Sequence, residues 1–401
     1  MARLLFSTIE KISRGVLMEF IMDIFEARDV VTCLSDVAPQ KTISGLPLGV
    51  KIEAFDTGEV VFSVNETSLV SVRKSVAKVA SSGSAVVCLE TLYKAVIGFS
   101  PFNENTNNGV TELRFNKASQ NISITTRSAY GKKTVSNKRL LQFLDVSIPG
   151  FLITNDGFIT MPLNAVVQGL RSVLSSAASN VDSGGFDGVL FSINKGELKT
   201  VSMDGVCLTE FVTSVGDLSW EGSCVLSTGN VTKIVKFLYK LLLGNSEGLV
   251  DIFINNRMFM FRVGSFVAGF PLLISKFPEY SALFSADRKN FIIDKKIFLD
   301  NLKNISFSSD NSDDFRVVLA FYGGELNIST ATCENAGIKL EGGGEGNLHI
   351  DFNINILERC VHSMLGDKII FLYKDRHSPV VIKAATVGET SIVRSILAPL
   401  R

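Results

Sequence analysis

Histidine is scarce in this chain, with three among 401 residues: His349, His362 and His377. None of the three stands at a metal-binding spacing. A G-x-S-x-G or Walker-type loop is also missing. The glycine-rich "GGGEG" at 342–346 has no following Lys-Ser/Thr, which favours a hairpin loop over a phosphate cradle. We therefore expect no catalytic residue, no metal and no cofactor, and we predict that the chain is not an enzyme.

Net charge and paired cysteines are missing as well. Lysine plus arginine equals aspartate plus glutamate, so any affinity for nucleic acid must come from an uneven distribution of charge. Charged residues interrupt the apolar N-terminus, which excludes a signal peptide and a membrane span. The cysteines form no C-x-x-C pair, and we expect buried, reduced thiols in a soluble, cytoplasmic protein: Cys33, Cys88, Cys207, Cys224, Cys333 and Cys360.

One pattern of apolar alternation and turns occurs three times in the sequence. In each copy an alternating apolar run leads into a Gly-acid-apolar turn and a second alternating run, at 46–70, 185–211 and 313–341. The turns recur roughly every 130 residues, which is the usual size of a domain. We predict an N-terminal extension (1–17) followed by a first repeat (18–150), a second repeat (151–285) and a third repeat (286–401).

Each repeat also contains two amphipathic segments at helical spacing. They follow the order helix, strand pair, helix, strand pair, which predicts an α+β protein. Asp294 is a candidate N-cap, and Pro162 suits a first helical position. The expected helices are 25–37, 89–99, 162–177, 229–243, 294–305 and 353–365.

The polar faces of these helices are mainly basic. Lys233, Lys236 and Lys240 fall within about 60° of one another on a helical wheel, opposite an apolar face. Comparable faces carry Arg28, Lys94, Arg171 and Arg359, and Lys296 and Lys303 share theirs with Asp300. A polar face with lysine is ordinary for one surface helix, but polar faces on six helices in three repeated units make that ordinary explanation less sufficient.

Five short segments, in order along the chain, resemble the beta subunit of bacterial DNA polymerase III, the sliding clamp. The 185–211 hairpin resembles the family's middle-domain signature, and "KFPEY" its Arg-Phe-Pro-Asp-Tyr segment. "FNINILERCV" resembles its Phe-Asn-hydrophobic helix start, "SPVVIKAA" its Ser-Pro-hydrophobic strand, and "LAPLR" its C-terminal Met-Pro-Met-Arg-Leu. The resemblance is divergent and covers the chain from about residue 18 to 401.

The resemblance implies three clamp-type domains with sheets outside and two helices per domain lining a pore. Two chains would close head to tail into a ring around double-stranded DNA, held without sequence specificity. We expect the ring to close between the first and third repeats, near 128–135 and near Ile305 and Phe307. The predicted DNA-contacting residues are Arg28, Lys41, Lys94, Arg171, Lys233, Lys236, Lys240, Lys296, Lys303 and Arg359.

The resemblance also implies a cleft between the second and third repeats that binds short peptides of DNA polymerases and clamp loaders. Its predicted residues are Phe186, Met203, Gly205, Leu208, Pro278, Leu283, Phe315, Asn353, Ile356, Pro379, Leu397, Ala398, Pro399, Leu400 and Arg401. Val206 and Cys207 stand where the family often has His-Arg, and no leucine follows Arg401. These departures predict a different peptide preference.

Two other hypotheses stay open at this point. The chain could be a β-rich scaffold or binding protein whose repeat arose by duplication without a role on DNA. A hydrolase is a third possibility, which the missing catalytic motifs disfavour.

Overall fold

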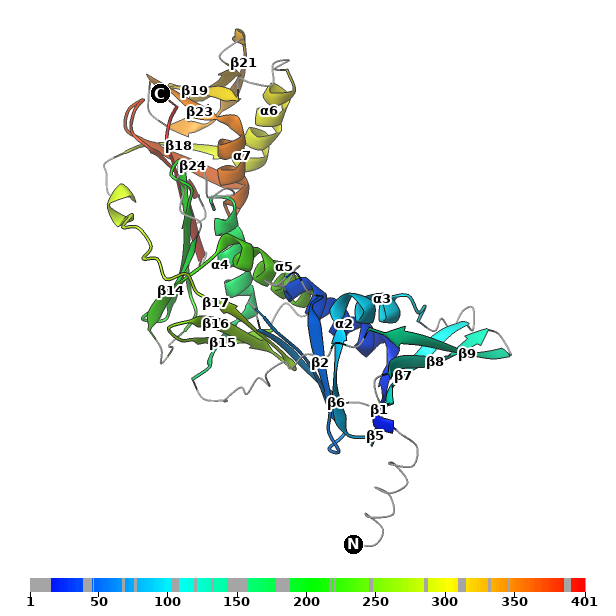
Figure 1. Cartoon of the computed structure of the whole chain (residues 1–401). Coiled ribbons are helices and arrows are strands. Elements are labelled where there is room, and N and C mark those ends of the chain that lie inside the picture. Colours follow the sequence, from blue (N-terminus) through cyan, green and yellow to red (C-terminus); the bar gives the residue numbers. More distant parts are fainter. Residues whose placement is uncertain are drawn as a thin grey trace. The chain divides into compact units, whose positions relative to one another are not determined.

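The structure is a computed structural model in which two compact units are distinguished, Met1–Phe158 with Val250–Pro271 and Ile159–Leu249 with Leu272–Arg401 (Figure 1). The described residues are 16–38, 45, 47–66, 69–75, 78–101, 108–118, 121–130, 133–142, 144, 157–177, 188–216, 218, 221–244, 248–284, 288–308, 315–330, 333–344, 347–385 and 391–400.

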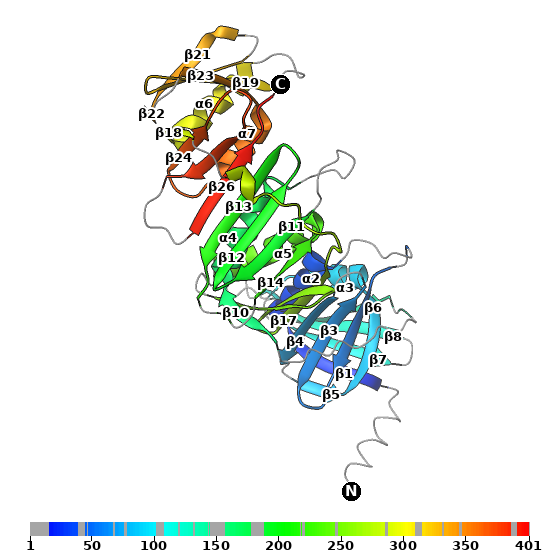
Figure 2. The same ribbon diagram turned by 90° about the vertical axis from the view of Figure 1, so that its left-hand side faces the viewer.

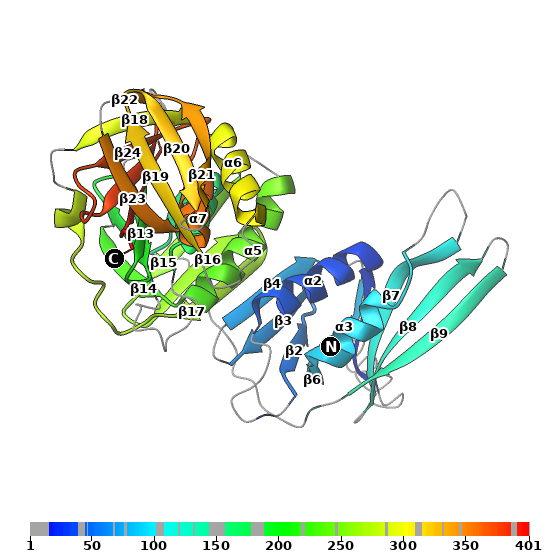
Figure 3. The ribbon, with the colours of Figure 1, turned by 90° about the horizontal axis from the view of Figure 1, so that it is seen from above.

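The first unit contains a five-stranded antiparallel sheet in the order β5-β1-β7-β8-β9. Helix α2 (Ile24–Val37) packs beside α3 (Leu89–Ile97), and Figure 3 shows both helices over the strands. Asp23 caps α2 through its Oδ1, which accepts from the Phe25 amide at 2.7 Å. The strands are β1 (Val16–Asp23), β5 (Lys78–Ser81), β7 (Asn108–Ala118), β8 (Asn121–Tyr130) and β9 (Lys133–Leu141).

A second sheet of this unit combines strands of the first and second repeats, in the order β15-β16-β17-β4-β3-β2-β6. The two repeats meet where β17 pairs with β4, from Phe266 opposite Val72 to Gly269 opposite Leu69. The strands are β2 (Gly49–Ala54), β3 (Glu59–Asn65), β4 (Leu69–Ser75), β6 (Gly83–Cys88), β15 (Leu249–Ile254), β16 (Met258–Val263) and β17 (Phe266–Pro271).

Three phenylalanines join the two sheets of the first unit. Phe20 of β1 stacks on Phe115 of β7 at 4.6 Å, and Phe62 of β3 meets Phe20 edge to face at 6.2 Å. All three are buried. The inward positions of the alternating runs therefore form the core, as period-two patterning requires.

The second unit is built on a nine-stranded antiparallel sheet, in the order β14-β11-β12-β13-β26-β25-β24-β18-β22. β13 of the second repeat pairs with β26 of the third, from Cys207 opposite Leu397 to Thr213 opposite Ser391 (Figure 2). The strands are β11 (Val189–Asn194), β12 (Glu197–Met203), β13 (Cys207–Ser214), β14 (Gly222–Leu226), β18 (Lys289–Asp294), β22 (Gly343–Gly344), β24 (Lys368–Tyr373), β25 (Val380–Ala384) and β26 (Ser391–Leu397).

A four-stranded sheet, β21-β20-β19-β23, completes the third repeat. Phe321 of β19 stacks on Tyr373 of β24 at 4.5 Å and so joins the two sheets, as Phe20 and Phe62 do in the first repeat. The strands of this sheet are β19 (Arg316–Tyr322), β20 (Glu325–Thr330), β21 (Cys333–Glu341) and β23 (Asn347–Asn353). In the second repeat, the short strand β10 (Ile159–Pro162) precedes helix α4.

Four helices pack in pairs within the second unit: α4 (Leu163–Leu174) with α5 (Thr228–Gly244), and α6 (Lys295–Ser308) with α7 (Ile354–Ser363). Asp294 accepts from the Ile297 amide at 2.9 Å, which confirms it as the N-cap of α6. Along the stretches described above, no helix has both the length and the apolar character needed to cross a membrane.

The predicted hairpins and all six predicted helices are present, so the α+β architecture is confirmed. Pro162 lies just before α4 rather than inside it. The 305–307 segment, predicted as a free edge, belongs to helix α6, and Ile305 is 5% exposed. The segment therefore provides no strand edge, and its predicted place at the ring contact stays a prediction. The three-domain boundaries stay a prediction.

Candidate functional site at the junction of the second and third repeats

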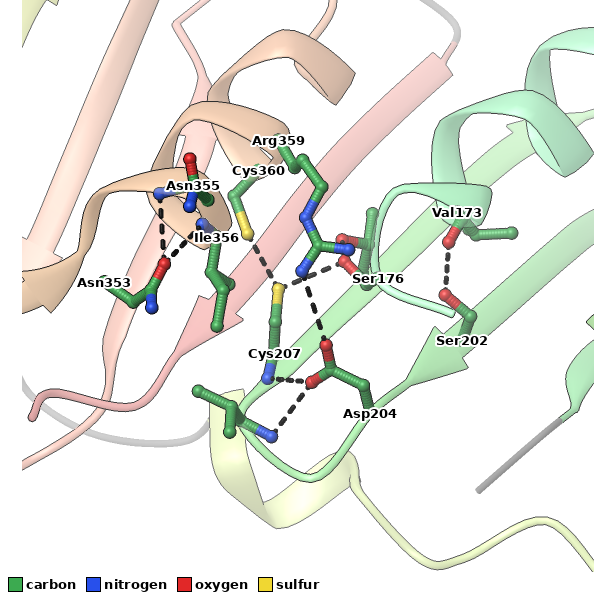
Figure 4. A network of polar contacts seen from close by, with 12 residues as sticks. Val173, Ser176, Ser202, Asp204, Cys207, Asn353, Asn355, Ile356, Arg359 and Cys360 are labelled. Carbon is green, nitrogen blue, oxygen red and sulfur yellow. Dashed lines mark hydrogen bonds and ion pairs between the residues drawn. The ribbon is translucent and has the colours of Figure 1, made fainter. Parts of the chain in front are cut away.

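A tight turn between β12 and β13 stands at one end of the junction. Gly205 has φ +88°, a left-handed conformation that favours glycine. Asp204 accepts from the Val206 amide at 3.0 Å and from the Cys207 amide at 2.7 Å, and its other carboxylate oxygen lies 3.7 Å from Arg359 of α7 (Figure 4). The turn is thus fixed within the second repeat and paired with the third.

The C-terminal segment runs from this turn to the four-stranded sheet. The Ala398 amide donates to the Val206 carbonyl at 2.9 Å, and the Leu400 amide donates to the Asp351 carbonyl at 2.8 Å. Leu397 is fully buried, whereas Leu400 is 37% exposed. The backbone is therefore held at both ends while an apolar side chain stays accessible beyond the last strand.

Helix α7 begins beside this segment. Asn353 accepts from the amides of Asn355 at 3.0 Å and Ile356 at 3.2 Å, so its side chain satisfies donors of the first helical turn (Figure 4). Ile356 is half-buried. This capping of helix α7 is a structural role that accounts for asparagine at position 353.

Next to the turn, buried thiols and hydroxyls connect α7 to the second repeat (Figure 4). The sulfur of Cys207 lies 2.7 Å from that of Cys360 and 3.1 Å from the Ser176 hydroxyl. The hydrogen bond to Cys207 and burial raise the pKa of Cys360 well above its usual range. Because the thiolate is the reactive form, these contacts make Cys360 a structural rather than a reactive cysteine.

The linker that follows β17 packs onto the sheet with its aromatic side chains. Phe277 and Tyr280 are buried in a cluster with Leu208, Val381 and Ile396, which joins both repeats. Met203 packs against the same cluster. Leu283 is 44% exposed and Pro278 is exposed. The linker therefore has solvent-accessible apolar side chains close to its buried aromatic residues.

One carboxylate lies deep under the linker. Glu210 of β13 is 1% exposed and stands opposite Arg394 of β26 in the strand register. Arg394 donates to it at 2.6 Å through Nε, and the Tyr280 hydroxyl donates at 2.8 Å. Arg394 also lies 3.8 Å from the centre of the Phe284 ring. Burial and the Glu210 charge raise the pKa of Tyr280, which keeps its hydroxyl a donor.

The structure places the predicted cleft residues in different surroundings. Gly205, Asn353, Ile356, Ala398 and Leu400 come together around the turn, and Leu208 and Leu397 are core residues. Phe315 is 48% exposed just before β19, and its carbonyl accepts from the Ile354 amide at the start of α7. Phe186 and Arg401 lie outside the described residues, and Pro379 and Pro399 are half-buried.

The predicted basic face is only partly available. Lys236 and Lys240 of α5, Lys296 and Lys303 of α6, and Arg171 are exposed, and Arg171 lies 4.9 Å over the Tyr239 ring. Lys233 is half-buried rather than exposed, and burial lowers its pKa. The helical wheel gave the correct direction for the Lys233 side chain. A wheel contains no information on neighbouring elements, however, and their packing covers part of the aliphatic stem of this lysine.

Other predicted basic positions also contact groups inside the chain. Arg28 is half-buried and donates to the Phe99 carbonyl at 2.8 Å. Lys94 pairs with Glu90 one turn before it, which raises the pKa of Lys94. Lys41 lies outside the described residues. A hollow of about 550 Å³ between α6 and α7 is lined by Lys296, Lys303 and His362 but also by three aspartates, so its charge is mixed.

Sequence reasoning missed Glu210, Arg394 and Arg288. An acidic residue at an inward position of an apolar strand was the available signal for Glu210, since such a group is rarely buried without a partner. Arg394 gave no local signal, because its partner is 184 residues away.

Sheets that continue from repeat to repeat, each repeat with two packed helices, define the fold as that of a DNA clamp. The chain has this fold over nearly its whole length, as its likeness to solved bacterial clamps shows. One of them, the Pseudomonas aeruginosa sliding clamp bound to griselimycin, has a TM-score of 0.80 at 16% identity, covering 96% of this chain and 99% of that one.

Two further clamps give the same result at similar divergence. The Thermotoga maritima DNA polymerase III beta subunit has a TM-score of 0.79 at 16% identity, and the Bacillus subtilis sliding clamp 0.80 at 18%; both matches cover 96% of this chain and 99% of the other. No protein-family model and no curated protein sequence matches the chain. The resemblance noted in the sequence is thus confirmed at the level of fold.

Proposed function

We propose that this protein is a DNA sliding clamp, a processivity factor that encircles duplex DNA and tethers a replicative polymerase in the cytoplasm. The observation that carries the proposal is the clamp fold, which matches bacterial clamps over 96% of the chain. In this role the protein is not an enzyme, and its surfaces bind rather than react.

The proposed DNA contact is electrostatic and independent of sequence. The lysines of α5 and α6 would meet phosphates, and phosphate contacts position a protein without reading bases. With no net charge, the chain is a poor general DNA binder, so retention would come from topology.

The proposed ring contains two copies joined head to tail. β9 and β21 are the terminal strands of their sheets and belong to the first and third repeats. Pairing β9 of one chain with β21 of the other would cover both edges and close the ring. The 305–307 segment of α6 stays a second candidate contact on the third repeat.

The proposed partner site is an apolar cleft around the turn that precedes β13. Leu400, Leu283 and Pro278 would form its accessible walls, with Gly205 and Ile356 beside them. A short peptide with apolar anchors suits such a surface, because apolar side chains in well-packed pockets carry most of the binding energy. Polymerase and clamp-loader peptides are the proposed ligands.

Retention on circular DNA tests the proposal. The protein is incubated with a nicked circular plasmid and passed through a gel-filtration column before and after the plasmid is linearised. A clamp stays with the circle and is lost from the linear DNA. Equal retention on both forms would identify an ordinary DNA binder, and no retention on the circle would leave the chain without a clamp function.

The native mass provides a second and independent test. A ring of the proposed kind requires a mass of two chains, each of 43.6 kDa. A protein that stays monomeric at micromolar concentration would contradict the proposed ring.

A further inference from the structure

The guanidinium of Arg288 contacts two backbone carbonyls that belong to opposite sides of the proposed cleft. Its Nη2 donates to the Leu283 carbonyl at 3.0 Å, and its Nη1 donates to the Pro379 carbonyl. Leu283 belongs to the linker, in the 3₁₀ turn η2 (Ser281–Phe284), whereas Pro379 directly precedes β25 of the third repeat. One side chain thus connects two predicted cleft residues that are distant in sequence.

Arg288 is well placed to hold them. It directly precedes β18, whose first residue pairs with Tyr373 of β24, so its own backbone is anchored in the sheet. Its side chain is half-buried, and burial lowers its pKa. Among the described residues no carboxylate contacts it, so the carbonyls are what hold the guanidinium in place.

A second tether fastens the other end of η2. Tyr280 is buried with its hydroxyl on Glu210, and its carbonyl accepts from the Leu283 amide at 2.9 Å. Leu283 therefore has its amide held through Tyr280 and its carbonyl held by Arg288, while its side chain stays 44% exposed. The backbone is fixed so that an apolar side chain can face outward in one position.

We propose that Arg288 is a positioning residue that sets the spacing between the linker wall and the third-repeat wall of the cleft, acting through Leu283 and Pro379. The inference rests on the proposed peptide-binding function. Arginine suits the task because its planar fork presents two donors in a fixed geometry, whereas a lysine ammonium is one point on a flexible stem. Arg288→Lys keeps the charge and removes the fork, which makes it the informative variant.

The experiment measures the affinity of a fluorescein-labelled peptide, taken from the clamp-binding segment of a bacterial replicative polymerase, for four proteins. These are the unaltered chain, Arg288→Lys, Leu283→Ala and the double variant. Loss of one charge-assisted contact predicts a roughly tenfold weaker Kd for Arg288→Lys. In the Leu283→Ala background the same change should weaken binding by less than about threefold, because the residue through which Arg288 acts is gone. Arg257→Lys, at an exposed turn of the first unit, is the matched control and should leave the Kd unchanged.

Hydrogen exchange on the same proteins tests the tether without any peptide. Arg288→Lys should speed exchange in the 281–284 segment and leave α4 and α5 unaffected. Equal affinity losses in both backgrounds, or unchanged exchange at 281–284, would overturn the inference. If the unaltered chain binds no polymerase peptide, the proposed peptide-binding function fails and the positioning role with it, while faster exchange in the variant still shows the tether itself.

Discussion

Removing Arg394 should destabilise the second unit strongly, because it leaves a buried charge without its main partner. Glu210 is 1% exposed, and its carboxylate is held by Arg394 and the Tyr280 hydroxyl. Breaking a buried ion pair from one side costs about 3–5 kcal/mol. The Arg394 side chain is 38% exposed, so water screens part of the pair and the lower end of that range, about 3 kcal/mol, is expected.

The measurement is chemical unfolding of Arg394→Ala followed by circular dichroism. A triple variant, Glu210→Leu with Arg394→Leu and Tyr280→Phe, removes every polar member of the group. Replacing a whole buried pair by apolar residues is often neutral, so the triple variant should recover most of the stability that the single variant loses. The solvent-exposed pair of Lys94 and Glu90 provides the control, and Lys94→Ala should leave the unfolding midpoint unchanged.

Two results would refute this reasoning. A loss below about 1 kcal/mol for Arg394→Ala would mean that the carboxylate finds another partner or water. A triple variant as unstable as the single one would mean that Arg394 contributes through its packing on Phe284 rather than through charge.

Three further outcomes are expected. Lys236→Glu with Lys240→Glu should weaken the affinity for a short linear duplex at low salt and lower the dependence of that affinity on salt, while leaving the fold intact. Lys233 is spared because a half-buried carboxylate there would cost stability; an unchanged affinity and salt dependence would remove α5 from the DNA-facing surface. Deleting residues 398–401 should abolish polymerase-peptide binding and lower stability by about 1–3 kcal/mol through two lost backbone hydrogen bonds, while dimerisation is kept; undiminished peptide affinity would contradict the cleft assignment. Burial raises the pKa of Cys224 to about 12, so iodoacetamide at pH 9 should leave this cysteine unmodified in the native protein. Mass spectrometry measures the alkylation, and a Cys224 alkylated as fast as the half-exposed Cys33 would contradict its burial.

Local elements were predictable because their signals are local. Gly58, Gly196 and Gly324 occupy the predicted turns and all have positive φ, which is the conformation that favours glycine there. Alternation identified the strands, and a helical apolar period bounded by capping residues such as Asp294 identified the helices to within a few residues. These properties depend on neighbours in sequence.

The contacts of the candidate site were less predictable because they depend on register between distant strands. Glu210 faces Arg394 only because β13 and β26 pair with Cys207 opposite Leu397, and a shift of one residue would separate them. The tether from Arg288 to Pro379 spans 91 residues in the same way. The family resemblance predicts a cleft in this region, but it could not distinguish core residues such as Leu397 from accessible ones such as Leu400.

The strand pairings between repeats have a consequence for how this chain can be divided. The β4–β17 junction joins the first and second repeats, and the β13–β26 junction joins the second and third. A fragment cut at the boundaries between repeats would expose unpaired edges, which favour aggregation. Both compact units instead have their boundaries inside the second repeat, at Phe158, Leu249 and Pro271, and so keep each of these sheet junctions whole. Dissection into soluble halves should follow those boundaries, with the second repeat shared between the two pieces rather than isolated as a piece of its own.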